Sequence, residues 1–136
     1  MKGNQKVIDS FNKLLANELA AIDQYFIHSR MYDDWGLNKL YERLNHEMEE
    51  EKDHADWLIK RILFLEGVPN MTKRRDLLIG SDVKSMMQND LTLELEVVDC
   101  VKEAIAICEE EKDYQSREVL EKLLFDTEED HVYWLE

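Results

Sequence analysis

Apolar residues recur at spacings of three and four along most of the chain, which is the period of an amphipathic α-helix. Four such stretches can be separated, over residues 5–34, 37–66, 82–112 and 113–136. The first ends at Trp35-Gly36, where glycine permits the left-handed turn that reverses the chain. The third begins at Ser81-Asp82, residue types typical of a helix N-cap. The spacing therefore predicts four long helices.

The connection over residues 67–81 has no sustained period and contains Gly67, Pro69 and Gly80. A helix of about 29 residues is roughly 43 Å long, and about 15 extended residues can span that distance. The third helix can therefore start at the end opposite to where the second one stops. We expect one domain over residues 1–136, an all-α four-helix bundle with a long crossover between helices 2 and 3, which is the ferritin-like connectivity.

Composition and charge narrow the class of protein. One proline and four glycines in 136 residues leave little loop, which argues against sandwiches, barrels and βαβ folds. A net charge of -14 repels nucleic-acid phosphates, and the basic clusters Lys60-Arg61 and Lys73-Arg74-Arg75 are too short to form a binding surface. We therefore expect no nucleic-acid partner.

The chain also carries no sign of a membrane or an oxidising compartment. It has no apolar run near the length of a membrane span, and its first residues lead into no signal peptide. Cys100 and Cys108 are eight residues apart on one predicted helix, about 12 Å along its axis, too far for a disulfide. We expect them to pack in the core of a cytoplasmic protein, with no membrane partner.

One carboxylate interrupts the apolar stripe of each predicted helix, and a buried unpaired carboxylate is too costly to keep without a partner. On the second and fourth helices a histidine follows one turn later, so that both side chains point the same way. The set consists of Glu18, Glu51 with His54, Glu94, and Glu128 with His131.

Four carboxylates balance the charge of two divalent ions, whereas without metal they would raise one another's pKa values and destabilise the core. Mixed carboxylate and imidazole ligands suit iron or manganese better than zinc. The alternative is that these glutamates lie on the surfaces of helices whose phase has been misassigned. The pattern matches the known donor set of di-iron carboxylate bundles.

Several stretches spread along the chain resemble the bacterioferritin family, and the match extends over essentially the whole chain. They are Met1-Lys2-Gly3, Leu14-Leu15-Ala16-Asn17-Glu18-Leu19, Gln24-Tyr25-Phe26-Ile27-His28-Ser29-Arg30-Met31, Asp34-Trp35-Gly36-Leu37, Ile62-Leu63-Phe64-Leu65-Glu66-Gly67, and Asp113-Tyr114 with Ser116-Arg117.

The resemblance implies a cytoplasmic iron-storage shell of 24 subunits built from dimers. Each subunit would be a ferroxidase, oxidising Fe(II) with O2 or H2O2 and passing Fe(III) to a mineral core. Its di-iron ligands would be the six residues named above, with Glu51 and Glu128 bridging the ions. Tyr25 matches the aromatic residue beside the centre.

The chain departs from the haem-binding members of the family. Those members use a methionine directly after the Glu of the first Glu-x-x-His, and here that position is Lys52, which is no iron ligand. Met48 is a weak candidate and Met31 a further one, although such methionines are more often packing residues. We do not expect haem b in a homo-oligomer. The chain resembles subunits that pair with a haem-binding partner.

The family continues the fourth helix and adds a short fifth helix, which lines a channel of the shell. This chain stops at Trp134-Leu135-Glu136, one turn after His131. Either the chain is incomplete or this subunit lacks the element, and closure of the shell is in doubt.

The resemblance also implies an iron site on the inner surface. His46 and Glu50 match it, with Asp126 as a third ligand; the alternative is an exposed histidine beside solvated acids. His28 follows the core face of the first helix and is expected to be structural.

Other functions fit the same fold. One is a di-iron or di-manganese peroxidase or catalase, although a rubrerythrin would need a Cys-x-x-Cys pair that the chain lacks. Another is a structural shell subunit that co-assembles with a haem-binding partner. A DNA-shielding mini-ferritin fits least, because its centre lies between subunits and this chain supplies all six ligands itself.

Overall fold

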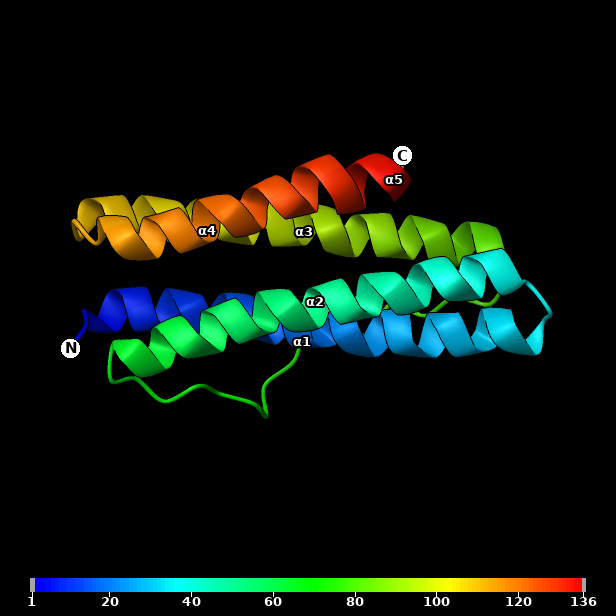
Figure 1. The fold of residues 1–136 in the computed structure, drawn as a ribbon, viewed down its shortest axis with the longest axis horizontal. Coiled ribbons are helices and arrows are strands. Elements are labelled where there is room, and N and C mark those ends of the chain that lie inside the picture. The colour runs from blue at the N-terminus through cyan, green and yellow to red at the C-terminus, as the bar shows by residue number, and fades with distance from the viewer. Residues whose placement is uncertain (1, 136) are drawn as a thin grey trace.

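The computed structural model describes residues 2–135, which form a bundle of two antiparallel helix pairs and contain no strand (Figure 1). The first pair packs against the second. The fourth helix of the bundle, here called the fourth column, changes along its length from α-helix to π-helix and back to α-helix. The elements are α1 (Gln5–Asp34), α2 (Asn38–Phe64), α3 (Val83–Glu110), α4 (Tyr114–Asp126), the π-helix η1 (Thr127–Val132) and α5 (Tyr133–Leu135). The predicted all-α four-helix bundle with a long crossover between the second and third helices is confirmed. Within residues 2–135, no helix has the length and apolar character needed to traverse a bilayer.

Local side-chain chemistry explains where the helices begin and reverse. The side chain of Asp82 accepts a hydrogen bond from the backbone N–H of Ser85, as part of a reciprocal capping box. Asp113 caps α4 in the same way through the N–H of Ser116. Gly36 has a φ of 74°, so the predicted left-handed turn between α1 and α2 is present.

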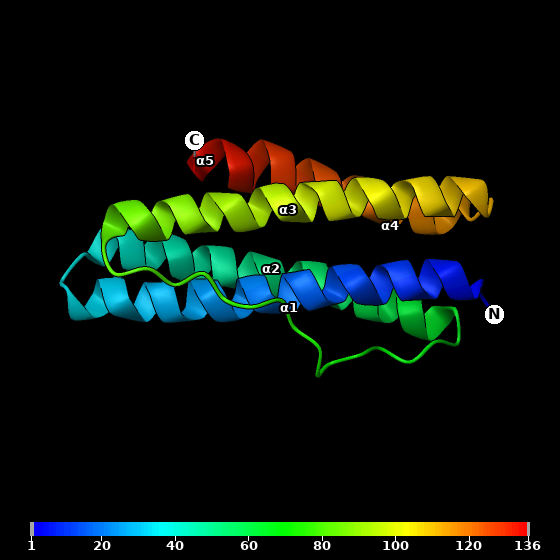
Figure 2. The ribbon, with the colours of Figure 1, turned by 180° about the vertical axis from the view of Figure 1, so that it is seen from behind.

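The long crossover runs along α1 and reaches the far end of the bundle (Figure 2). Near its start, the Asn12 side-chain amide donates to the carbonyl of residue 68 at 3.1 Å and accepts from the N–H of residue 70 at 2.8 Å. Near its end, Gln24 accepts from the N–H of Leu78 at 2.9 Å, and His28 Nε2 lies 2.7 Å from the Ile79 carbonyl. His28 is fully buried and fastens the crossover, which is the structural role expected for it.

The core is divided into two apolar clusters, and along α1, α2 and α3 a buried carboxylate separates them. On α1, Glu18 adjoins Leu19, the last α1 residue of the first cluster, and the second cluster begins at Ala21. Glu51 lies between Met48 and Ala55 on α2 in the same way. The buried carboxylates of α1, α2 and α3 therefore lie at about the same height along the bundle, in its middle.

The π-helix in the fourth column was not predicted. In a π-helix each backbone N–H donates to the carbonyl five residues earlier, so one turn contains about one residue more than a turn of α-helix. Side chains after its start therefore point in directions that the α-helical period does not give. At its entry, the Thr127 hydroxyl donates to the Leu123 carbonyl at 2.9 Å and the side chain is fully buried.

The two cysteines are buried and unoxidised, as expected of packing residues. Burial raises the pKa of Cys100, and burial with the nearby Asp113 carboxylate raises the pKa of Cys108 to about 11. Because the thiolate is the reactive form, both thiols should be inert near neutral pH.

We therefore expect native protein to resist iodoacetamide at pH 8 and guanidinium-unfolded protein to be alkylated at both positions. Intact-mass spectrometry counts the added groups. Rapid labelling of the native protein would contradict the packing role.

Candidate metal centre

Three of the four predicted carboxylates meet in the middle of the bundle, one each from α1, α2 and α3. Glu18, Glu51 and Glu94 are all fully buried, and so are the rings of His54 and His131 within about 1%. His54 Nδ1 lies 3.0 Å from Glu18 Oε2 and 3.5 Å from Glu51 Oε2. His131 Nδ1 lies 3.5 Å from Glu51 Oε1. Five of the six predicted ligands are therefore brought to one place.

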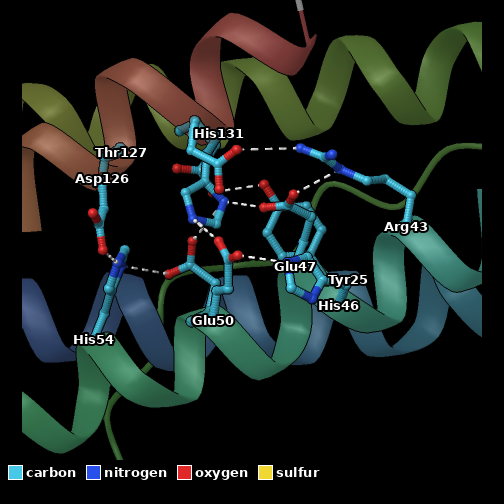
Figure 3. Close-up of polar contacts among 12 residues, drawn as sticks. Tyr25, Arg43, His46, Glu47, Glu50, His54, Asp126, Thr127 and His131 are labelled. Carbon is cyan, nitrogen blue, oxygen red and sulfur yellow. Dashed lines mark hydrogen bonds and ion pairs between the residues drawn. The ribbon is translucent and has the colours of Figure 1, made fainter.

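A second group of donors adjoins the first and shares His131 with it. Glu47 contacts His131 Nδ1, and Glu50 Oε2 lies 3.2 Å from His131 Nε2, as the labelled side chains in Figure 3 show. One donor atom each from Glu47, Glu50, Asp130 and His131 lie within 4.8 Å of one another. The same spacing holds for Glu51, His54 and His131. Two neighbouring positions could thus hold cations.

Glu47 was not among the predicted ligands. It lies one helical turn before Glu51 and is 1% exposed, so these carboxylates share the inner face of α2. The spacing of four from Glu51 was the signal that could have revealed it. Arg43, a further turn back, lies with Nε 2.8 Å from Glu47 Oε1.

The buried carboxylates are under-satisfied among the described residues. Six buried carboxylate oxygens within residues 2–135 are held only by ion pairs or by other acids: Oε1 of Glu18, both oxygens of Glu47, both oxygens of Glu51, and Oε2 of Glu94. Leaving a buried charged acceptor without a partner costs at least about 1–3 kcal/mol. Oxygen donors gathered with two imidazoles fit divalent iron or manganese, so the residues present suit a pair of such ions.

The carboxylates at the first position differ in their affinity for protons. Burial, followed by the charges of Glu18 and Glu94, raises the pKa of Glu51 well above its usual range. Burial opposes ionisation of Glu18 too, but hydrogen bonding with His54 and Glu51 lowers the pKa of Glu18 overall. Without metal, Glu51 therefore takes up a proton more readily than Glu18 does.

The imidazoles respond to the same carboxylates. Burial disfavours the charged ring of His131, but the adjoining Glu47 outweighs this and raises the pKa of His131 to about 9. Burial opposes the charge of His54 as well, yet Glu18 raises the pKa of His54. Because metals bind the neutral imidazole, cation binding here must release protons.

Tyr25 lies beside this group, as predicted. Its hydroxyl donates to Glu94 Oε1 at 2.6 Å. Burial, with the charges of Glu94 and Asp90, raises the pKa of Tyr25 well above its usual range, so the phenol remains protonated. Tyr25 therefore orients one oxygen of Glu94 and leaves the other free.

The expected inward position of Glu128 is not found. Its side chain is exposed, whereas Thr127, the preceding residue, is fully buried. The physical reason is the π-helix, whose additional residue per turn changes which side chains face the core. His131 still points inward, so the Glu-x-x-His spacing of the fourth column does not place both donors together.

The three residues expected to form an inner-surface iron site are not assembled as predicted. His46 is exposed and lies with Nε2 2.6 Å from Glu50 Oε1, so these two residues do meet. Asp126 instead contacts His54, with Oδ2 3.3 Å from Nε2. Asp126, the last residue of α4, thus faces His54, two turns along α2 from His46.

The weak haem candidate Met48 is a packing residue, being buried in the apolar cluster around Tyr25 and Leu44. Met31 packs against the same cluster. Lys52 is exposed and lies 3.2 Å from Glu49.

Comparison with known proteins gives consistent similarities over the full length. The model of a family described as "Ferritin-like domain" matches residues 8–136. The chain is 57% identical to the "Bacterial ferritin" of Synechocystis and 58% identical to that of Pseudomonas aeruginosa. These alignments cover 100% of this chain and 87% and 88% of the two relatives. Identity to the "Bacterioferritin" of Brucella melitensis is 42%, over 100% of this chain and 84% of that relative.

Proposed function

The chain belongs to the ferritin family, and from that membership we propose that it is a ferroxidase that oxidises Fe(II) inside each subunit and stores the Fe(III) product. The observation that carries the proposal is the group of buried carboxylates gathered beside two imidazoles in the middle of the bundle. Such a group is unfavourable in a metal-free protein and favourable around cations.

The residues of the centre have separable roles in this proposal. Glu18 and His54 hold the first iron position, and His131 belongs to the second. Glu51 lies 3.5 Å from the ring nitrogens of both histidines, so it can serve both positions. Glu94, oriented by Tyr25, supplies a further oxygen.

The chemistry supplied by iron is a two-electron transfer. Two Fe(II) ions become Fe(III), and the two electrons with two protons reduce O2 to H2O2, or H2O2 to water. Protons displaced from Glu51 and the two imidazoles upon binding are available at the same place. The apolar clusters on both sides limit the access of water to the centre.

Wild-type protein should accelerate Fe(II) oxidation over buffer and keep the ferric product in solution. Absorbance near 300–350 nm in a stopped-flow instrument follows oxidation, and the iron that remains with the protein after gel filtration measures storage. Prior loading with Zn(II), which binds the same donors without redox chemistry, should suppress the fast phase. Oxidation no faster than in buffer would refute the ferroxidase proposal.

We further propose that subunits assemble into a closed shell of 24 built from dimers, either alone or mixed with a haem-binding partner subunit. Large apolar side chains remain exposed on α1 and the crossover, which supports burial against a second copy. They include Phe26, Ile27, Leu77 and Ile79. Native mass spectrometry would report the subunit number, and peaks of monomer alone would contradict assembly.

A further inference from the structure

The last part of the crossover is held against the bundle by buried polar side chains. Within one subunit, the side chains of residues 71–80 are mostly exposed, so apolar packing contributes little. The N–H of Leu78 donates to Gln24 at 2.9 Å, and the carbonyl of Ile79 lies 2.7 Å from His28 Nε2. Gln24 and His28 are both fully buried on α1. These two side chains therefore fix the path of the segment.

Both side chains are bound in turn to one carboxyl group on α3. Asp90 Oδ1 accepts from Gln24 Nε2 at 2.9 Å and lies 2.8 Å from His28 Nδ1. The Asp90 side chain is fully buried. One carboxyl group thus orients the two residues that hold the crossover.

This arrangement needs one proton more than a neutral imidazole and a carboxylate supply. A carbonyl oxygen only accepts, so His28 Nε2 must donate to Ile79. In a neutral ring His28 Nδ1 then carries no hydrogen, and its lone pair would face a carboxylate oxygen at 2.8 Å. The contact is favourable when the ring is doubly protonated or when the Asp90 carboxyl carries the proton. In either form the pair holds one shared proton that can be lost.

We propose that His28 and Asp90 form a pH-sensitive switch, which keeps residues 77–80 against α1 as long as the shared proton is bound. Without that proton the neutral ring has a single N–H and can serve only one of its two acceptors, Ile79 or Asp90. Gly80, with a φ of 88°, follows directly and permits a change of backbone direction. Loss of the proton should therefore release the end of the crossover. The switch goes beyond the proposed iron chemistry and does not depend on it.

The titratable groups around this pair favour a transition at high pH. Burial raises the pKa of Asp90, although hydrogen bonding with His28 opposes the rise. The proton is therefore retained at low pH and lost as the pH increases. Two phenols also face Asp90. Burial, followed by the charge of Asp90, raises the pKa of Tyr32 to about 12, and the pKa of Tyr25 lies well above its usual range. Both phenols therefore stay neutral while the pair titrates.

Hydrogen exchange measured by mass spectrometry on the full-length protein tests this switch. The reporter is the amide of Leu78, read from peptides that cover residues 74–82 and corrected for the intrinsic exchange rate at each pH. In the wild type its protection should fall with increasing pH, by about tenfold per pH unit above the midpoint, which is the slope for one proton. Peptides from residues 97–108 of α3 should keep their protection. Constant protection of Leu78 between about pH 6 and pH 10 would refute the switch.

Two variants distinguish the shared proton from packing alone. Asp90→Asn keeps an oxygen that can accept from Gln24 but removes the negative charge that retains the proton, so the midpoint should fall by about 1–3 pH units. His28→Gln offers an amide N–H to the Ile79 carbonyl and has no group that titrates. In that variant the protection of the crossover should not depend on pH.

Asp23→Asn is the matched control, because it changes another contact of the same crossover. Asp23 Oδ2 lies 2.9 Å from Arg74 Nε at the surface, so this variant removes one charge without altering the buried pair. It should keep the wild-type midpoint. An unchanged midpoint in Asp90→Asn, or a wild-type pH profile in His28→Gln, would overturn the inference. Circular dichroism checks that each variant is folded, and the wild-type profile tests the switch even where a buried variant is not.

Discussion

Replacing Glu18 or His54 with alanine is expected to abolish fast Fe(II) oxidation while leaving the fold and the assembly largely intact. Each change removes a donor from the first cation position, and His54 Nδ1 lies only 3.0 Å from Glu18 Oε2, so both losses fall on one ion. We expect the initial rate in stopped-flow absorbance to fall by about 100-fold or more.

The matched control is Glu49→Ala, an exposed change on the same helix as His54. It removes a surface pair with Lys52 that contributes little to stability. Native mass spectrometry should show the same assembly for all of these proteins. Unchanged oxidation in Glu18→Ala or His54→Ala would show that the ligands are wrongly assigned.

Glu51→Gln should have opposite effects on stability with and without metal. In the metal-free protein, burial and the neighbouring carboxylates raise the pKa of Glu51 well above its usual range. At pH values above about 4.5 the unfolded chain releases this proton freely, while the folded protein does not. Wild-type stability therefore declines as pH rises from there to the raised pKa, by about 1.4 kcal/mol for each pKa unit of displacement. The amide has no proton to lose and escapes this decline.

Thermal unfolding monitored by circular dichroism measures both effects. At pH 7, metal-free Glu51→Gln should unfold at a higher temperature than wild type, by roughly 3–5 °C per kcal/mol gained. Saturating Co(II) should reverse the order, because an ion at 100 times its Kd stabilises the wild type by about 2.7 kcal/mol. Glu49→Gln should change neither value. A metal-free variant less stable than wild type would mean that the buried Glu51 carboxyl does not destabilise the metal-free protein.

The helices and crossover could be predicted from the sequence because each depends on local chemistry. The 3.6-residue period, Gly36 and the Asp82 cap fix three of the helix ends within a few residues. Glu18, Glu51 and Glu94 could be placed inside for the same reason, since each interrupts an apolar stripe on a regular helix.

The fourth column could not be predicted in this way. A π-helix gives no period of its own in six residues, and its effect is to turn Glu128 outward and Thr127 inward. Glu47 was missed for a different reason. It belongs to an acid-rich stretch of α2, and in the sequence only its spacing of four from Glu51 distinguishes this glutamate from its more exposed neighbours.

The crossover divides the chain into two hairpins, and the donors are divided with it. The amino-terminal hairpin carries Glu18, Glu51 and His54, whereas Glu94 and His131 come from the other hairpin. A cation bound by donors from both hairpins would be a reversible cross-link between the two halves of the bundle. Amide hydrogens where the two hairpins meet should therefore exchange more slowly in the metal-bound subunit. The supply of iron would then determine how often the two hairpins separate.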